Sequence, residues 1–568
     1  MASVVELFDL ALRHHQSRNL AQAESLYHQI LQVEPAHVEA RHLLGALAHQ
    51  TGRHEVAISL IRGAIALCPT VPLFHTNLGL VLRQQGHHAE AVLCFREALR
   101  LDPSYVDALE NLGNVFRDQG NAAEAAQCFR QVLALNPGHA QAHNNLGVAL
   151  QDQGRLAEAI ECFRQALKFD PQFTMALNNL GSTLLDQGQV DEAVRCFREV
   201  LRLDPNDANA HNNLGVALKE IGQFEEALAC HERALYLQPD STCAHWIHAS
   251  ARWNLSLLRL LKGDFREAWP DFEYQWLIFG AVPRHVDRPR WDGSSLEGKT
   301  ILLHPEQGLG DTLHFIRYAP MVKDRGGTVL FECQPPLLRL LEGVAGIDQL
   351  IARGAPLPHF DVQAPLMSLP GLFGTTLATI PAAIPYVNAC PTLVLEWRKE
   401  LPPGFKIGIA WQGNPEHAGD RRRSVPLRYF ESLARLQGVR LVSLQKGPGT
   451  DQLPQWIGNP SQVFSVLDLH NRLETFADTA AVMMNLDLIV TVDTAVAHLA
   501  GALGVPAWVL LPFAPDWRWL LERSDSPWYP TLRLFRQSRR GDWGEVFDRL
   551  TAEITISKSQ NSKYHEES

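Results

Sequence analysis

The sequence lacks several features that would point to particular classes of protein. Its nine cysteines include no Cys-x-x-Cys pair. Basic residues are not in excess, because 51 Lys and Arg stand against 62 Asp and Glu, and the net charge of −11 argues against a nucleic-acid partner. The longest apolar stretch, residues 486–513, is broken by Asp487, Asp493 and His498. We therefore expect no transmembrane segment and no secretory leader, and the chain is predicted to be cytoplasmic.

What the sequence does contain is a repeat with a period of 34 residues in its first half. Cysteine, glycine and proline all recur with this period, and a period of this size indicates a helical solenoid. The cysteines mark one packing position of the repeat, and stacked helices hold such positions too far apart for disulfides. The cysteines are Cys94, Cys128, Cys162, Cys196 and Cys230, and the glycines of one slot are Gly45, Gly79, Gly113, Gly147, Gly181 and Gly215.

These units resemble tetratricopeptide repeats, which are stacked pairs of antiparallel helices. One unit has Gly45, Ala57, Ile61 and Pro69 at the positions typical of that repeat. The resemblance implies an all-α TPR solenoid of about seven repeats over residues 1–241. A displaced copy of the motif after residue 253 predicts a divergent capping repeat and linker over residues 242–296, because the end of a solenoid must cover its last apolar face.

Five asparagines occupy one slot on the first helix of successive units, which we expect to line the concave face. A ladder of amides can bond an extended peptide backbone without reading its sequence, and similar ladders occur in the repeats of eukaryotic protein O-GlcNAc transferases. The alternative is that asparagine belongs to the repeat and satisfies local backbone groups. A protein or peptide acceptor is the predicted partner of this face. The candidate peptide-binding residues are Asn77, Asn111, Asn145, Asn179 and Asn213.

The second half has a different pattern, in which short apolar runs alternate with helical segments. This alternation predicts parallel sheets of the doubly wound type. A proline-rich segment divides the region, so we expect two Rossmann-like domains facing across a cleft, over residues 297–395 and 396–554, followed by a disordered tail over 555–568. The predicted strands are residues 300–304, 328–332, 406–410, 439–444, 487–492 and 507–511.

Two segments follow predicted strands where such a cleft would lie. In the first, a glycine turn and a helix start would let a ligand approach the backbone, although an aspartate that caps the helix explains the pattern too. In the second, a histidine lies one helical turn beyond a threonine, and a packed histidine with a capping Asp-Thr pair is the alternative. The candidate ligand-binding residues are Gly308, Gly310, Asp311 and Thr312, and then Asp493, Thr494, Ala495 and His498.

Together, Gly310-Asp311 and the segment from Asp493 to His498 resemble the ADP-heptose:lipopolysaccharide heptosyltransferases, the family 9 glycosyltransferases of GT-B fold. The resemblance covers about residues 297–550 and implies a GT-B module with Asp311 as general base and the 493–498 segment in contact with a nucleotide sugar. It also implies a phosphate contact from a basic residue before a proline. Arg423 is the best match, Arg421 and Arg422 are alternatives, and Lys446 is a further candidate for the diphosphate.

The predicted function is glycosyl transfer from a nucleotide-diphosphate sugar to an acceptor hydroxyl, by a single displacement with inversion. The second half has no Asp-x-Asp motif, so we expect no metal, and no cofactor other than the donor substrate. Two alternatives stay open. One is a protein O-GlcNAc transferase-like enzyme that uses a UDP-sugar, and the other is a non-catalytic TPR interaction scaffold with a degenerate sugar-nucleotide-binding domain.

A late run, residues 516–530, is rich in tryptophan, tyrosine and arginine. Aromatic faces can stack on sugars or bases, and arginine can bind phosphate. The alternative is that the run plugs the hinge between the two domains. The sequence alone leaves both interpretations open.

Overall fold

The computed structural model describes residues 3–238, 245–278, 285, 287–417, 419–455 and 466–566. The chain divides into two compact units, Met1–Pro205 and Asn206–Ser568. The first unit is entirely helical in its described residues, and the second combines helices with parallel sheets.

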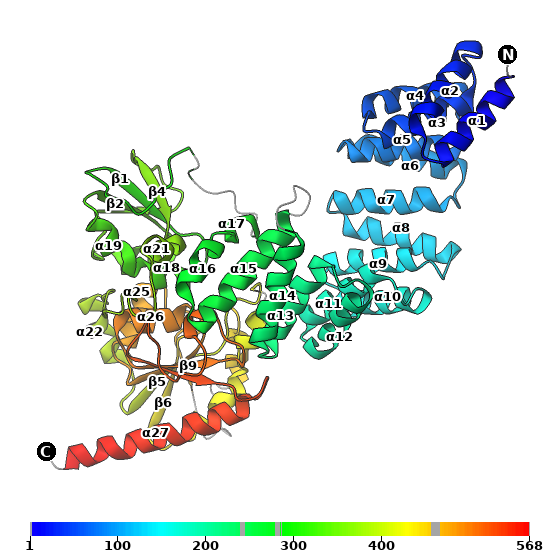
Figure 1. Ribbon diagram of the computed structural model, residues 1–568. Coiled ribbons are helices and arrows are strands. Elements are labelled where there is room, and N and C mark those ends of the chain that lie inside the picture. Colours follow the sequence, from blue (N-terminus) through cyan, green and yellow to red (C-terminus); the bar gives the residue numbers. More distant parts are fainter. Residues whose placement is uncertain are drawn as a thin grey trace. The chain divides into compact units, whose positions relative to one another are not determined.

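The first unit is a stack of antiparallel helix pairs (Figure 1). The two helices of a pair approach each other most closely at the glycine of the recurrent slot. A Cβ at Gly79, for example, would lie 2.6 Å from the ring of Phe95 on the partner helix. Gly86 ends its helix with a φ of 79°, a conformation that favours glycine. The helices are α1 (Val4–Gln16), α2 (Leu20–Val33), α3 (Val38–Gln50), α4 (His54–Leu67), α5 (Pro72–Gln84), α6 (His88–Leu101), α7 (Val106–Asp118), α8 (Ala122–Leu135), α9 (Ala140–Asp152), α10 (Leu156–Phe169), α11 (Thr174–Gln187) and α12 (Val190–Leu203).

The second unit begins with one further pair of the repeat, α13 (Ala208–Glu220) and α14 (Phe224–Leu237). The segment predicted as a capping repeat forms α15 (His245–Lys262) and α16 (Phe265–Phe272), followed by the short α17 (Gln275–Ile278). Helices α15 and α16 pack against each other, and Gly263 between them has a φ of 94°. This segment therefore forms two helices that pack on each other across a glycine turn.

The first sheet has the strand order β3-β2-β1-β4, with all four strands parallel. Short helices connect the strands. The strands are β1 (Thr300–His304), β2 (Thr328–Cys333), β3 (Gln349–Ala352) and β4 (Val362–Pro365). The helices are α18 (Leu309–Phe315), η1 (Ile316–Tyr318), α19 (Ala319–Lys323), η2 (Pro335–Leu337), α20 (Leu338–Leu341), η3 (Leu366–Ser368) and α21 (Leu369–Leu372).

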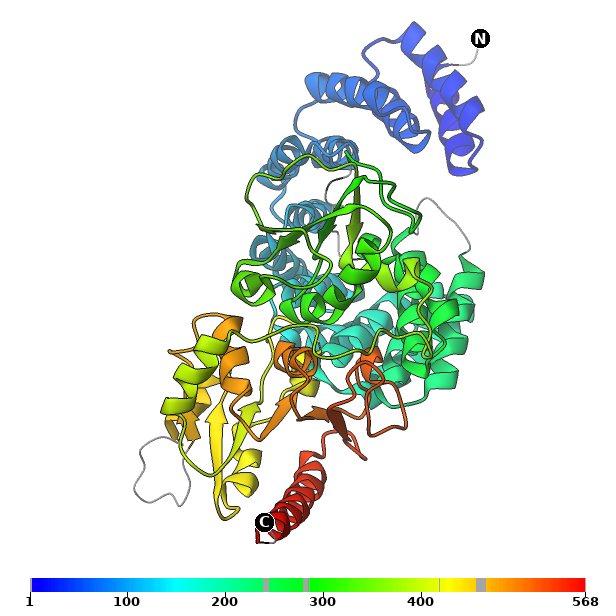
Figure 2. The ribbon, with the colours of Figure 1, turned by 90° about the vertical axis from the view of Figure 1, so that its left-hand side faces the viewer.

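The second sheet has the order β10-β9-β8-β5-β6-β7, again parallel, and forms a layer separate from the first (Figure 2). Its strands are β5 (Phe405–Ala410), β6 (Val439–Ser443), β7 (Val466–Asp468), β8 (Leu488–Val492), β9 (Ala507–Leu511) and β10 (Leu532–Arg536). Its helices are α22 (Pro391–Glu400), α23 (Asp420–Arg423), η4 (Leu427–Phe430), α24 (Glu431–Ala434), η5 (Thr450–Gln455), α25 (Phe476–Met483), α26 (Ala495–Leu503), η6 (Trp517–Trp519) and α27 (Trp543–Glu566).

The prediction of parallel sheets is confirmed, and each of the six predicted strands matches an observed strand to within one residue at either end. The predicted domain boundary at residues 395/396 falls inside α22, which packs against α25 beside the second sheet. Residues 555–566, predicted to be a disordered tail, instead continue α27. The start of α27 buries Phe547 and Leu550 in the core of the second sheet, and extending an anchored helix costs less than starting one.

The cysteines of the repeat slot are free thiols, as predicted, and lie buried or half-buried. Burial raises the pKa of Cys94, Cys128, Cys162 and Cys196 to about 11. Among the helices of the described residues, none combines the length and the apolar character needed to cross a membrane.

Candidate functional site

Three predicted ligand-binding segments follow strands at the places where the strand order of each sheet reverses. The 308–312 segment follows β1, which lies between β2 and β4. In the second sheet, Arg423 lies in the connection after β5 and Asp493 directly follows β8, and these two strands are neighbours from which the chain moves outward in opposite directions. Ligands of open parallel sheets bind at the carboxyl ends of strands where the order reverses.

The two glycine- and aspartate-bearing segments lie against each other through α18 and α26. A Cβ built on Gly310 would lie 3.0 Å from Cδ2 of His498 and 3.4 Å from Cα of Ala495. Glycine at this position lets the two helix starts approach closely. The connections that follow β1 and β8 therefore contact each other.

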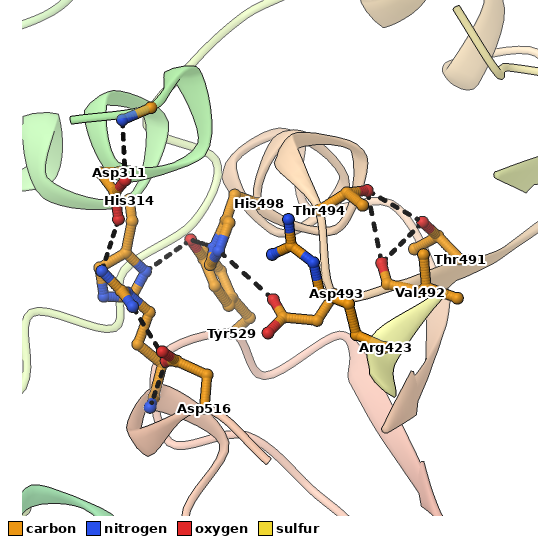
Figure 3. A network of polar contacts seen from close by, with 12 residues as sticks. Asp311, His314, Arg423, Thr491, Val492, Asp493, Thr494, His498, Asp516 and Tyr529 are labelled. Atoms are coloured by element: carbon orange, nitrogen blue, oxygen red, sulfur yellow. Dashed lines mark hydrogen bonds and ion pairs between the residues drawn. The ribbon is translucent and has the colours of Figure 1, made fainter. Parts of the chain in front are cut away.

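Asp311 is held by two hydrogen bonds. Its Oδ2 accepts from the backbone N–H of Gly308 at 3.0 Å, and its Oδ1 accepts from Nη2 of Arg518 at 2.5 Å (Figure 3). Arg518 also donates through Nη1 to Asp516 at 2.9 Å. Burial alone would raise the pKa of Asp516, but the charge and hydrogen bonds of Arg518 bring it below its usual value. Arg518 thus links two carboxylates, both of which are partly exposed.

The hydroxyl of Tyr529 lies between two histidines from the two facing helices (Figure 3). It is 2.8 Å from Nδ1 of His314 on α18 and 3.0 Å from Nδ1 of His498 on α26. Burial and the nearby arginines lower the pKa of His498 to about 3, and burial lowers that of His314 well below its usual value. Both imidazoles are therefore neutral at physiological pH, and the triad is a hydrogen-bonded seam rather than a charged site.

Asp493 lies within the same polar cluster, with Oδ1 4.0 Å from Nε2 of His498. Burial and the nearby Asp516 raise the pKa of Asp493, while Arg423 and Arg518 oppose this shift. Arg423 lies beside Asp493 (Figure 3) and donates through Nε to Asp420 at 3.2 Å. The guanidinium groups of Arg423 and Arg518 thus approach this buried carboxyl from the second sheet and from the 516–530 run.

A cavity of about 320 Å³ opens beside the connection that follows β5. Its volume is at the lower end of the range for small-molecule sites. The side chain of Gln445 holds the backbone of this connection, because its Oε1 accepts from the N–H groups of Trp411 and Gln412. The cavity is lined by Gln412, Pro415, Asp420, Arg421, Ser424, Val425, Pro426 and Gln452.

Several predicted residues have other contacts. The hydroxyl of Thr312 is buried and bonded to the side chain of Gln334, and Thr494 Oγ1 bonds to the carbonyl of Val492. Lys446 donates to the backbone carbonyls at residues 473 and 474. Gly308 contributes its N–H to Asp311 rather than presenting it outward.

The aromatic run forms a plug rather than an open stacking surface. Trp519, Trp528 and Tyr529 are less than 2% exposed, so their faces are not accessible to a ligand. Trp517 packs edge-on against Trp269 of α16 at 5.8 Å between ring centroids. The sequence singled out this run but did not connect Arg518 to Asp311, since their pairing spans 207 positions.

The asparagine slot lies on odd-numbered helices, which contact one another directly in the pairs α3–α5, α5–α7 and α9–α11. Asn179 donates through Nδ2 to Oδ1 of Asn144 at 2.9 Å, and Asn77 lies 2.8 Å from Nε2 of His42. Asn111 bonds to a backbone carbonyl of its own helix, and Asn145 accepts from Gln141. These amides thus bridge successive repeats or bond locally, while Asn77, Asn111 and Asn179 stay partly exposed.

Among the described residues, no group of three or more His, Cys, Asp or Glu side chains is placed to hold a metal ion.

Models of the tetratricopeptide repeat match residues 8–72, 76–127, 111–172, 162–195, 181–222 and 208–241. The first ~240 residues are therefore tetratricopeptide repeats, as the sequence predicts. Such repeats suggest a peptide or protein partner.

Protein FlbA of Caulobacter vibrioides is 26% identical to this chain over 321 residues, which cover 52% of this chain and 53% of that protein. The chain thus spans about half the length of that curated relative.

Three solved structures resemble parts of the chain. The MamA protein is 22% identical over 30% of this chain and 92% of its own, with a TM-score of 0.28. YrrB, described as a TPR protein with an unusual peptide-binding site, is 26% identical over 32% and 95%, with a TM-score of 0.28. A tetratricopeptide repeat protein from Parabacteroides merdae is 16% identical over 44% and 98%, with a TM-score of 0.38.

Proposed function

We propose that the α/β region is a glycosyltransferase of GT-B type, similar to the family 9 enzymes, and that the repeats recruit a protein or peptide acceptor. The observation that supports this most directly is the contact between α18 and α26 at Gly310 and His498. It brings a partly exposed aspartate after β1 close to a buried Asp493 and Arg423 from the second sheet, at two positions where strand order reverses.

In this proposal the acceptor hydroxyl loses its proton to Asp311 as its oxygen attacks the anomeric carbon of the donor. The new carbon–oxygen bond forms while the bond from that carbon to the diphosphate breaks, so the configuration inverts. The diphosphate leaves with the bonding electron pair, stabilised by Arg423 and the first amides of α26. Arg518 positions Asp311 through its 2.5 Å hydrogen bond.

The second candidate is a non-catalytic interaction scaffold. It is favoured by the two hydrogen bonds that already engage the carboxylate of Asp311, and by the buried aromatic plug, whose Tyr529 hydroxyl bonds to a histidine of α18 and a histidine of α26. A scaffold would bind partners through its repeats and would not turn over a nucleotide sugar.

Calorimetric titration of the full chain with ADP, UDP, GDP and their sugars separates these candidates. A glycosyltransferase binds at least one diphosphate and slowly hydrolyses the matching sugar nucleotide, and binding of UDP-sugars would favour the O-GlcNAc transferase-like alternative. Absence of binding across the whole panel contradicts the enzyme and favours the scaffold.

Asp311→Asn tests the catalytic assignment. The amide oxygen can still accept from Gly308, so we expect the helix start to persist while turnover falls by about 10²–10⁴-fold, the usual contribution of a general base. Binding of the diphosphate should stay unchanged. Asp451→Asn, at an exposed position in the same unit, is the matched control. Full turnover in Asp311→Asn would show that this carboxylate is not the base.

A further inference from the structure

The turn between α13 and α14, the two helices of the last matched repeat, lies directly against two connections of the second sheet. Glu220, the final residue of α13, forms an ion pair with Arg422 of α23. Two residues later, a Cβ built on Gly222 would lie 2.7 Å from the ring of Phe513, which follows β9. The turn after α13 is thus seated on the connections that follow both β5 and β9.

The ion pair is asymmetric in its exposure to solvent. The Glu220 side chain is 8% exposed and that of Arg422 is 42% exposed. A carboxylate that is nearly buried depends on its partner, because removing one member of such a pair leaves an uncompensated charge. This pair therefore constrains α23 more than an ordinary surface ion pair would.

α23 lies beside the cavity and the polar cluster. Its residues Asp420 and Arg421 line the cavity, and Arg423 at its end lies beside Asp493. By holding α23, Glu220 of α13 thus acts on this edge of the site.

We propose that the last tetratricopeptide repeat is part of the donor site: Glu220 is a positioning residue that holds α23 and its arginines beside the cavity. This proposal rests on the proposed function, since it assumes that the cavity takes a nucleoside diphosphate. It goes beyond recruitment, because the repeat then affects how tightly the donor binds even when no acceptor is present.

The test compares Glu220→Gln with wild-type protein by calorimetry with ADP and with UDP. We expect diphosphate binding to weaken about tenfold, equivalent to about 1.4 kcal/mol at 298 K. Glu220→Asp keeps the charge and should restore most of the affinity. The matched control is Asp152→Asn, which changes the same repeat position two repeats earlier, where the side chain is exposed. This variant should bind ADP and UDP with the same affinity as wild-type protein.

Hydrogen exchange provides a readout that needs no ligand. In Glu220→Gln the amides of residues 420–424 should exchange faster than in wild type, while those of α14 should not change. Equal affinity and equal exchange in Glu220→Gln would overturn the proposal. If wild-type protein binds neither ADP nor UDP, the proposed function fails for these donors, and the exchange measurement alone decides whether Glu220 holds α23.

Discussion

His231 occupies the repeat position at which earlier units carry phenylalanine, and this difference creates a testable pH dependence. Its ring packs over Gly215 as the phenylalanine rings pack over their glycines, and it is 1% exposed. Burial, with a smaller effect from Lys219, lowers its pKa to about 3. We expect His231→Phe to make the folded state less sensitive to acid. The phenylalanines of this slot are Phe95, Phe129, Phe163 and Phe197.

The size of the effect follows from proton binding in the two states. The folded imidazole stays neutral at pH 5, whereas in the unfolded chain the histidine, with its ordinary pKa of 6.5, is almost fully protonated. The stability that His231 contributes is therefore present above pH 6.5 and is lost as the pH falls towards 3. At pH 5 the loss is about 2 kcal/mol, against about 0.2 kcal/mol at pH 7.

The substitution leaves no obvious gap in the hydrogen bonding. Nδ1 of His231 lies 3.2 Å from Oδ1 of Asn212, and that oxygen also accepts from Asn254 at 3.2 Å. Asn212 therefore keeps a partner in the variant. The acid-dependent loss can then be assigned to the imidazole itself.

Tryptophan fluorescence is a suitable assay, because all 13 tryptophans lie in the unit Asn206–Ser568. Urea unfolding at pH 7 and pH 5 should show a free-energy difference between the two pH values that is smaller in His231→Phe by about 1.9 kcal/mol. The same difference in both proteins would refute the reasoning. Phe197→His is the converse control, since it adds a buried histidine to the other unit and should leave the fluorescence-detected pH dependence unchanged.

A glycine substitution and a cysteine-labelling experiment test the packing of the repeats. Gly147→Ala places a Cβ 2.6 Å from the ring of Phe163 and should destabilise the first unit by about 1–2 kcal/mol in thermal unfolding. The control Gly138→Ala, whose Cβ has only ordinary contacts, should leave the stability unchanged. Equal stability of the two variants would contradict close packing at Gly147. Cys128 is buried with a pKa raised to about 11, so iodoacetamide at pH 8 should leave it unmodified in the native protein and label it in urea, as read by peptide mass spectrometry. Labelling of Cys128 in the native protein as fast as in urea would be inconsistent with its burial.

The repeat and most of the sheets could be predicted because their signals are local and periodic. A 34-residue period fixes where each helix pair begins, and apolar runs such as residues 488–492 are unmistakable as buried strands. The strands β3, β4 and β7 were missed because they have only three or four residues, too few to show a pattern. Two arginines interrupt the apolar residues of the strand β10, and its position at the edge of the sheet explains that composition.

The candidate-site residues that directly follow strands could be predicted from the sequence, but the side chains that hydrogen-bond to them could not. Gly310 and Asp493 each follow a strand signal, so their place at a sheet edge follows from the sequence. Nothing local indicates that Asp311 pairs with Arg518, or that Tyr529 bridges two histidines from different helices. Lys446 had the right chemistry for a phosphate contact, yet its ammonium is engaged by backbone carbonyls.

The aromatic run and the displaced repeat are better understood together than separately. Composition cannot tell whether tryptophans stack on a ligand or on one another, since both uses need the same side chains. The use of the tryptophans depends on the surface that faces them. In this protein that surface is α16, whose Phe265 and Trp269 pack around Trp517. The capping segment thus covers the end of the solenoid through α15, which packs on α13 and α14, and covers the aromatic run through α16. Because one segment covers both apolar surfaces, the last repeats and the two sheets belong to a single compact unit, and this is why a residue such as Glu220 can reach α23.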